Sequence, residues 1–237
     1  MPIVRRLADP AAAAEAAADW LSHRIAEDVG RRRRAAIALA GGKTPELLYG
    51  ALMRIHARTA LPLDVVEWCF SDERMVPPDD ERSNFGLARR TLFEPLQIAF
   101  AKVHRFRGEA PDAEVEALRA EAELLAATPE GACDVVLLGM GKDGHVASLF
   151  PGAPESPPGR LVIPAEPGLD PRVGRLTFTF EAIARAREVV FVACGAEKAE
   201  VLRRVLIDKD QTLPAARVAP RSRRVAWFVD EAAAARL

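Results

Sequence analysis

Short apolar runs alternate with amphipathic stretches along most of the chain. Runs rich in Val, Leu, Ala and Phe predict strands at residues 35–40, 64–71, 135–138, 175–180, 188–194 and 224–230. Apolar residues that recur near helical spacing predict helices at 10–29, 46–58, 85–93, 113–127, 198–206 and 231–237. In the helix at 113–127, the expected apolar side carries Val115, Leu118, Leu124 and Leu125. This alternation predicts an α/β fold with three layers, a mainly parallel, Rossmann-like sheet between helices.

The elements follow one another without a linker, so we expect one domain, residues 1–237. Residues 152–171 are rich in proline and glycine and predict an irregular excursion over the surface. The net charge of −1 gives no overall field that would favour nucleic acid or an anionic membrane. The basic run Arg31–Arg34 lies between a predicted helix and a predicted strand, which favours a solvated turn over a nucleic-acid patch.

The cysteines and histidines give no support for a metal site. Cys69, Cys133 and Cys194 are far apart and lie in or beside apolar runs, as buried thiols do. The four histidines are also widely spaced, and no Cys-x-x-Cys pair occurs. No segment is long enough to span a bilayer, and the start does not resemble a signal peptide, so we expect a cytoplasmic protein without a membrane partner.

The strongest candidate chemistry follows the apolar run at 135–138. Lys142, Asp143 and His145 stand there among three glycines, Gly139, Gly141 and Gly144. Open α/β sheets place ligands at the carboxyl ends of their strands, so this turn is a candidate active site. A lone histidine after a glycine turn is more often structural, and a catalytic role depends on other segments meeting it.

A second glycine turn, Gly41-Gly42-Lys43-Thr44, follows the predicted strand at 35–40 and precedes a helix. Free backbone N–H groups at a helix start favour an anion, and phosphate is the obvious candidate. Gly42-Lys43-Thr44 imitates the end of a Walker A loop, but Ile37 stands where that motif needs a glycine. A plain strand-to-helix turn is the alternative interpretation.

Three charged residues, Asp72, Glu73 and Arg74, directly follow the predicted strand at 64–71. The carboxylates are able to orient hydroxyls or act as acid and base, and the guanidinium is able to grip an oxyanion. A surface cluster of ion pairs is the alternative. Ser83-Asn84 predicts the cap of the following helix.

Together these segments resemble the 6-phosphogluconolactonases. The resemblance rests on the glycine turn at 41–45, on Asp72-Glu73-Arg74 with Ser83-Asn84, and on Asp143-Gly-His-Val-Ala-Ser-Leu-Phe-Pro151. It continues through Arg175-Leu-Thr-Phe-Thr, Gly195 with Lys198, and Leu213-Pro-Ala followed by Trp227 and Asp230. The segment around His145 is highly specific, whereas the glycine turn alone is weak.

The resemblance implies the fold of the glucosamine-6-phosphate deaminases and hydrolysis of 6-phosphogluconolactone to 6-phosphogluconate in the pentose phosphate pathway, with no cofactor and no metal. It implies His145 as the general base, with Asp143 and Asp72 as further catalytic residues. Substrate-binding residues would be Gly41, Gly42, Lys43, Thr44, Arg74, Arg175 and Lys198. The partner would be a small sugar-phosphate lactone, with no nucleic acid, and we expect a monomer.

One departure and two alternatives accompany this interpretation. The family loop usually reads Ser-Gly-Gly-Ser-Thr-Pro, whereas Ala40 and Lys43 replace both serines here. A deaminase of the same fold would carry a carboxylate five residues after the histidine, where this chain has Phe150. A non-catalytic sugar-phosphate sensor would keep the anion loop but would not need His145 or the acidic pair.

Overall fold

A seven-stranded, fully parallel sheet forms the centre of the computed structural model, which describes residues 2–166 and 172–237. Four inner strands are buried at every position, as expected for strands covered on both faces. The strand order is β1 (Ile3–Leu7), β10 (Val225–Asp230), β9 (Glu188–Ala193), β6 (Val135–Leu138), β2 (Ala35–Leu39), β3 (Val66–Phe70) and β5 (Val103–His104).

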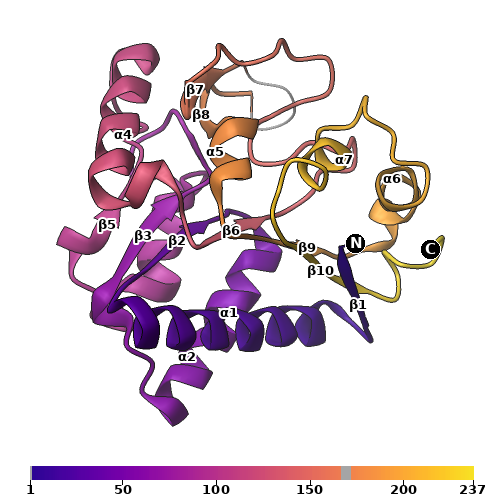
Figure 1. Ribbon diagram of the computed structural model, residues 1–237, viewed down its shortest axis with the longest axis horizontal. Coiled ribbons are helices and arrows are strands. Elements are labelled where there is room, and N and C mark those ends of the chain that lie inside the picture. The colour runs from indigo at the N-terminus through magenta and orange to yellow at the C-terminus, as the bar shows by residue number, and fades with distance from the viewer. Residues whose placement is uncertain (1, 167–171) are drawn as a thin grey trace.

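Helices cover both faces and complete the three layers that the sequence predicts (Figure 1). Below the sheet in that view lie α1 (Pro10–Arg32) and α2 (Lys43–Thr59); above it lie α4 (Ala113–Ala127), α5 (Phe180–Arg185), α6 (Ala199–Leu206) and α7 (Pro214–Val218). The short α3 (Asn84–Ala88) continues into a π-helical turn, Arg89–Phe93.

The first helix shows how local sequence sets the boundaries of an element. Asp9 accepts a hydrogen bond from the backbone N–H of Ala12 at 2.8 Å, and Pro10 occupies the first helical position. A face rich in alanine is buried and allows close approach to the sheet. The helix ends where Arg33 adopts a left-handed conformation with φ of 61°. The expected start is confirmed, and the helix runs three residues further than the predicted Val29.

A second, three-stranded antiparallel sheet lies above the main one. It contains β4 (Asp72–Arg74), β8 (Arg175–Phe178) and β7 (Val162–Ala165) in that order. The expectation of irregular structure across 152–171 is therefore wrong for 162–165, because buried Leu161 and Val162 draw this part into the sheet. Residues 167–171 of that expected excursion lie outside the described residues.

The predicted helix at 231–237 is also wrong. The backbone makes an i→i−4 bond from Ala234 N to Asp230 O and then an i→i−3 bond from Leu237 N to Ala234 O. Successive turns therefore replace a regular helix, and Asp230 caps them by accepting from Ala233 N at 2.8 Å.

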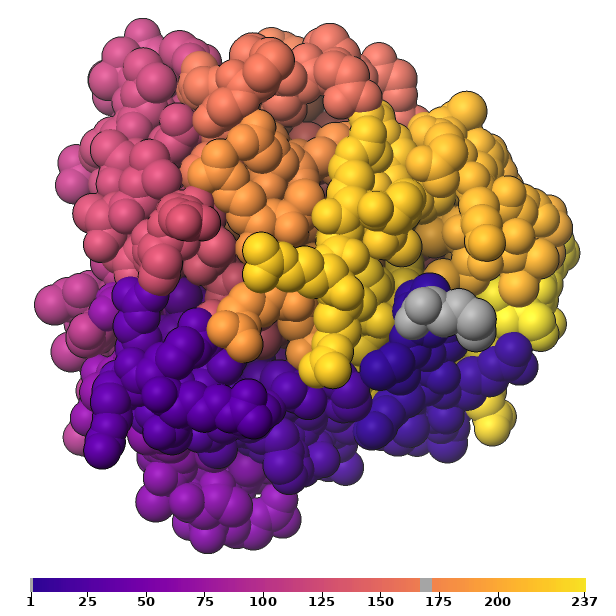
Figure 2. Space-filling view, in the orientation of Figure 1, coloured from indigo at the N-terminus to yellow at the C-terminus, as the bar shows by residue number. Residues whose placement is uncertain are grey.

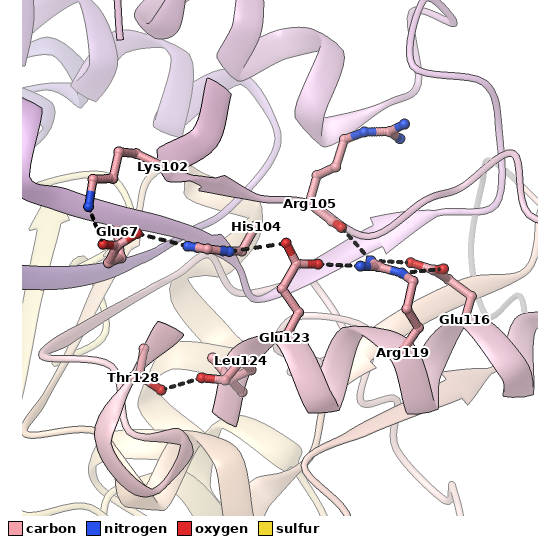
Figure 3. Close-up of polar contacts among 9 residues, drawn as sticks. All are labelled: Glu67, Lys102, His104, Arg105, Glu116, Arg119, Glu123, Leu124 and Thr128. Carbon is pink, nitrogen blue, oxygen red and sulfur yellow. Dashed lines mark hydrogen bonds and ion pairs between the residues drawn. The ribbon is translucent and has the colours of Figure 1, made fainter. Parts of the chain in front are cut away.

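A charged network joins the short edge strand β5 to α4 (Figure 3). His104 lies between two carboxylates, with Nε2 2.9 Å from Glu67 Oε2 and Nδ1 3.1 Å from Glu123 Oε1. Lys102 bonds Glu67 at 2.6 Å, and Arg119 pairs with Glu123. The hydrogen bond that His104 donates to Glu123 raises the pKa of His104 to about 9, and the same bond lowers that of Glu123 to about 2. Two carboxylates thus hold an imidazolium across three elements.

Candidate active site

The chain order reverses between β2 and β6, and the predicted site lies at this reversal. From β2 the chain adds β3 and β5 on one side, and β6 then pairs with the other side of β2. Such a switch point opens a crevice beyond the carboxyl ends of the strands. The segments that follow β9, β6, β2 and β3 therefore share one rim, and these segments carry Lys198, His145, Lys43 and Arg74.

His145 is held by Asp143. The Nδ1 atom lies 2.6 Å from Asp143 Oδ1, which also accepts from the backbone N–H of His145 at 3.2 Å. An ionised carboxylate only accepts hydrogen bonds, so Nδ1 carries the ring proton in this pair. Within residues 2–166 and 172–237, Nε2 has no hydrogen-bond partner, and 24% of the side chain is exposed. The ring therefore presents a basic nitrogen that solvent or substrate can reach.

Two of the glycines around His145 are required, Gly141 by close approach and Gly144 by its backbone conformation. A Cβ atom on Gly141 would lie 2.0 Å from His145 Nδ1, so a side chain there would displace the imidazole. Gly144 has φ of 82°, and its carbonyl accepts from Ala215 N at 3.0 Å at the start of α7. The close approach at Gly141 and the hydrogen bond at Gly144 together fix the conformation of this turn.

Asp72 is buried and has hydrogen-bond partners on both carboxylate oxygens. Ser148 Oγ donates to Oδ2 at 2.7 Å, and Asn84 Nδ2 donates to Oδ1 at 3.0 Å. The Ser148 backbone N–H in turn donates to Thr177 Oγ1 at 3.1 Å. Asp72 therefore connects β4, α3 and the segment after His145. Sequence reasoning missed Ser148 and Thr177, although Ser148 lies inside the specific motif.

Glu73 serves the start of α3. Its carboxylate accepts from Asn84 N at 2.7 Å, from Phe85 N at 2.8 Å and from Ser83 Oγ at 3.0 Å. Burial raises its pKa, and the hydrogen bonds oppose that shift. The predicted cap at Ser83-Asn84 is confirmed, since Ser83 Oγ also accepts from Gly86 N at 2.9 Å.

The turn at Gly41–Thr44 leads into α2, which begins at Lys43 rather than at the predicted Glu46. Gly42 has φ of 103°, a conformation that favours glycine. A Cβ on Gly41 would lie 1.7 Å from Asn84 Oδ1, so this turn packs directly on α3. The Lys43 side chain is exposed. The first N–H groups of α2 lack helical partners, as an anion-binding turn requires.

Two arginines lie beside each other on neighbouring strands of the second sheet. Arg74 on β4 and Arg175 on β8 are register partners, and Arg175 is only 5% exposed. Burial lowers the pKa of Arg175, the positive charge of Arg74 lowers it further, and the carboxylates of Asp72 and Glu73 oppose the shift. Arg74 donates to the carbonyl of Arg82 at 2.5 Å. Like charges opposite one another are unfavourable, and a bound anion would offset this cost.

The other predicted residues are distributed along the same rim. Lys198 directly precedes α6, beyond the carboxyl end of β9, which is two strands away from β2.

In the described part of the chain, no group of three or more His, Cys, Asp or Glu side chains is arranged to hold a metal ion. No described helix is both long and apolar enough to cross a bilayer.

Comparison with known proteins now decides the family. The model of the glucosamine-6-phosphate isomerases/6-phosphogluconolactonase family matches residues 8–227. The chain belongs to this family. It is 34% identical to the 6-phosphogluconolactonase of Haemophilus influenzae over 201 residues, which cover 83% of this chain and 85% of that protein. It is 38% identical to the human 6-phosphogluconolactonase over 213 residues, which cover 86% and 81%.

Solved structures of family members have the same fold. The 6-phosphogluconolactonase of Trypanosoma brucei superposes with a TM-score of 0.87 at 30% identity, covering 100% of this chain and 99% of that one. A monomeric glucosamine-6-phosphate deaminase superposes with a TM-score of 0.86 at 24% identity, covering 99% and 100%. The predicted fold class, a three-layer α/β structure like the deaminases, is confirmed.

Proposed function

We propose that this protein is a 6-phosphogluconolactonase, a hydrolase that converts 6-phosphogluconolactone and water into 6-phosphogluconate in the pentose phosphate pathway. The observation that carries the proposal is the His145–Asp143 pair at the switch point of the sheet. The family membership and the relatives of that name support the choice of substrate.

His145 acts as the general base. Its Nε2 accepts a proton from a water molecule as the water oxygen attacks the lactone carbonyl carbon. Asp143 keeps the ring proton on Nδ1 and stabilises the imidazolium that forms. When the tetrahedral intermediate collapses, the bond to the ring oxygen breaks, and that oxygen takes the proton from Nε2. A lactone is an activated ester, so this chemistry needs no serine nucleophile.

The phosphate group of the substrate is bound by Arg74, Arg175 and Lys198, with the backbone of Gly41 to Thr44 contributing N–H donors. The register pairing of Arg74 and Arg175 supports this assignment, because it places two positive charges on neighbouring strands of the second sheet. Lys43 would add an ammonium where the family usually has a serine.

Asp72 acts in this proposal as a positioning residue. Both of its oxygens already accept hydrogen bonds from protein donors, and its side chain is buried. Its carboxylate would fix Ser148, three residues beyond His145, and thereby hold the base in place. From the sequence alone, Asp72 was a candidate acid or base, and the proposal assigns it the positioning role instead.

The deaminase alternative receives no support from the site. Phe150 occupies the position of the deaminase carboxylate, and its ring centroid lies 4.8 Å from that of His145. An aromatic ring cannot transfer a proton at that place.

The deciding experiment is a proton-release assay on freshly prepared 6-phosphogluconolactone, corrected for spontaneous hydrolysis. Glucosamine 6-phosphate is the control substrate, with ammonia release as its readout. Catalysed release from the lactone alone supports the proposal. Turnover of glucosamine 6-phosphate, or no rate above the spontaneous one, contradicts it. The monomeric state and the cytoplasmic location stay predictions, and light scattering after gel filtration tests the first.

A further inference from the structure

Arginine side chains gather at the amino-terminal edge of the main sheet, opposite the candidate active site. Arg34, Arg187 and Arg224 directly precede β2, β9 and β10. Parallel strands begin at the same edge, so residues before neighbouring strands lie side by side. The backbone confirms this for β9 and β10, since Val189 N donates to the carbonyl of Arg224 at 2.9 Å. Figure 2 shows orange and yellow segments against the indigo N-terminal segment on the visible face.

Two adjoining cavities open at this edge, with volumes of about 640 and 570 Å³. They share Asp134, Arg187 and Arg223 in their walls. Arginines outnumber carboxylates among the residues that line the two, seven to five, although the whole chain carries a net charge of −1. The positive charge is thus concentrated locally.

The buried carboxylates at this edge have partners of their own. Asp134 accepts from Ala36 N at 2.8 Å and lies 2.7 Å from Arg32 Nη2. Glu188 lies 3.4 Å from Arg24 Nε. These pairs explain Arg24 and Arg32 as structural residues, because each offsets the cost of a buried charge.

In residues 2–166 and 172–237, no buried carboxylate lies within hydrogen-bond distance of the guanidinium groups of Arg187, Arg223 and Arg224. All three are exposed. The side chains of Arg223 and Arg224 make no hydrogen bond or close ion pair within the described residues, and the Arg187 guanidinium lies 4.0 Å from Asp134. Burial raises the pKa of Glu188, and the charges of Arg24 and Arg224 oppose that shift, in the case of Arg224 without a close contact. Three guanidinium groups therefore keep their donors available beside a pair of cavities.

We propose that this basic edge, defined by Arg187, Arg223 and Arg224, binds a compact polyanion of the oligophosphate class. A guanidinium matches two phosphate oxygens at once, and three of them need a ligand with several anionic groups. Among the described residues, no aromatic side chain lines either cavity, so nothing here would stack on a nucleotide base. The cavity volumes suit a small molecule rather than a protein surface.

This site is separate from the candidate active site. The inner strands are four to six residues long, and each residue adds about 3.3 Å, so roughly 13 to 20 Å of sheet lies between the two edges. Residues of the basic edge are therefore expected to change without an effect on lactone hydrolysis.

The test is calorimetric titration of the full chain with inorganic tripolyphosphate at about 0.05 M and about 0.2 M salt, which differ in screening. Arg223→Ser/Arg224→Ser should weaken saturable binding by at least about tenfold, as expected for two lost charge-assisted contacts. The matched control is Arg6→Ser/Arg90→Ser, which removes the same charge from two exposed arginines that line neither cavity. Its affinity should stay within about twofold of the wild type.

Arg74→Ala separates this binding from phosphate recognition at the candidate active site. The component lost in the Arg223/Arg224 variant should persist in Arg74→Ala. The proposal is overturned if the wild type shows no saturable binding, if both double variants lose affinity equally, or if Arg74→Ala removes that component instead.

Discussion

The hydroxyl of Ser148 lies 2.7 Å from Asp72 Oδ2, although 76 residues separate them in the chain. This hydrogen bond joins the segment that carries His145 to the end of β3 and the start of β4. It is buried, so water does not readily replace it. The position of the base therefore depends on a residue that need not touch the substrate.

Ser148→Ala tests this positioning. Removal of one buried donor to a carboxylate costs about 1 to 3 kcal/mol, so kcat should fall by roughly 5- to 150-fold if that energy holds the base in place. KM should change little, and the decline of the rate on acidification should keep its midpoint, because the base is still His145. A shifted or lost acidic limb in Ser148→Ala would instead make Asp72 part of the proton transfer.

His145→Asn should lower kcat by roughly 10²- to 10⁴-fold with KM little changed, the usual scale for a lost acid–base catalyst. In the wild type the rate should fall on acidification, because a protonated imidazole cannot accept the proton of water. His23→Asn is the matched control, since His23 is exposed on α1 far from the rim. Wild-type turnover in His145→Asn would assign the base to another group.

Arg74→Ala should raise KM for 6-phosphogluconolactone by roughly 10- to 100-fold, the scale of a lost charge-assisted contact of about 1.5 to 3 kcal/mol. Unphosphorylated gluconolactone should be affected much less. Arg82→Ala is the control, since Arg82 is a neighbour that pairs with Asp80 at 2.6 Å. Equal losses on both lactones would remove phosphate recognition from the role of Arg74.

The charged network around His104, which joins β5 to α4, predicts that the stability of the protein depends on pH. The folded pKa of His104 is raised to about 9 from an ordinary value of 6.5, mainly by the hydrogen bond that it donates to Glu123. A raised pKa means that the stabilisation is complete below pH 6.5 and is lost as the pH rises to about 9. The melting temperature should fall over this window, by roughly 2 to 4 °C for each kcal/mol lost.

His104→Gln keeps a polar side chain at this place but removes the titration. Its melting temperature should be lower than that of the wild type at pH 6 and should change less between pH 6.5 and 9. An unchanged slope in this variant would place the pH dependence elsewhere. Below pH 4.5 the wild type should lose stability as Glu123 becomes protonated, since its folded pKa is lowered to about 2, mainly by the hydrogen bond with His104. The variant lacks that bond and should lose less stability over this range.

The inner sheet was predictable because burial on both faces leaves an apolar run in the sequence. Residues 135–138 were predicted without error. The strands β4, β5 and β7 have two to four residues, too few for a period to appear, and their partners are distant in sequence. Their pairing depends on tertiary contacts that no local pattern records.

The sequence predicted the boundaries of α4 but not which of its side chains are buried. Its boundaries, Ala113–Ala127, were predicted correctly, yet of the four expected apolar contacts only Leu124 is buried. Val115 is 64% exposed and Leu118 is 50% exposed, whereas Glu116 is buried. Glu116 turns inward because it accepts from the backbone N–H of Arg107 at 2.8 Å. The hydrophobic pattern alone does not predict that a backbone donor buries Glu116 while Val115 and Leu118 stay exposed.

For the candidate site, the sequence predicted which loops meet but not how Asp72 is used. The motif around His145 and the charges after β3 follow strands, and strand ends are readable from sequence. The contact of Ser148 with Asp72 arises from the pairing of β4 with β8, which the sequence did not predict.

The pairing of β1 with β10 has a consequence for synthesis on the ribosome. Ile3 lies beside Ala226, so β1 emerges long before the strand with which it pairs, β10. Until then β9 also lacks a neighbour on one side, and its exposed backbone groups offer an edge to other nascent chains. Slow synthesis of the last part of the sheet, or truncation before β10, therefore leaves these edges unpaired. This is the stage at which the protein is most prone to aggregation and at which a chaperone would help most.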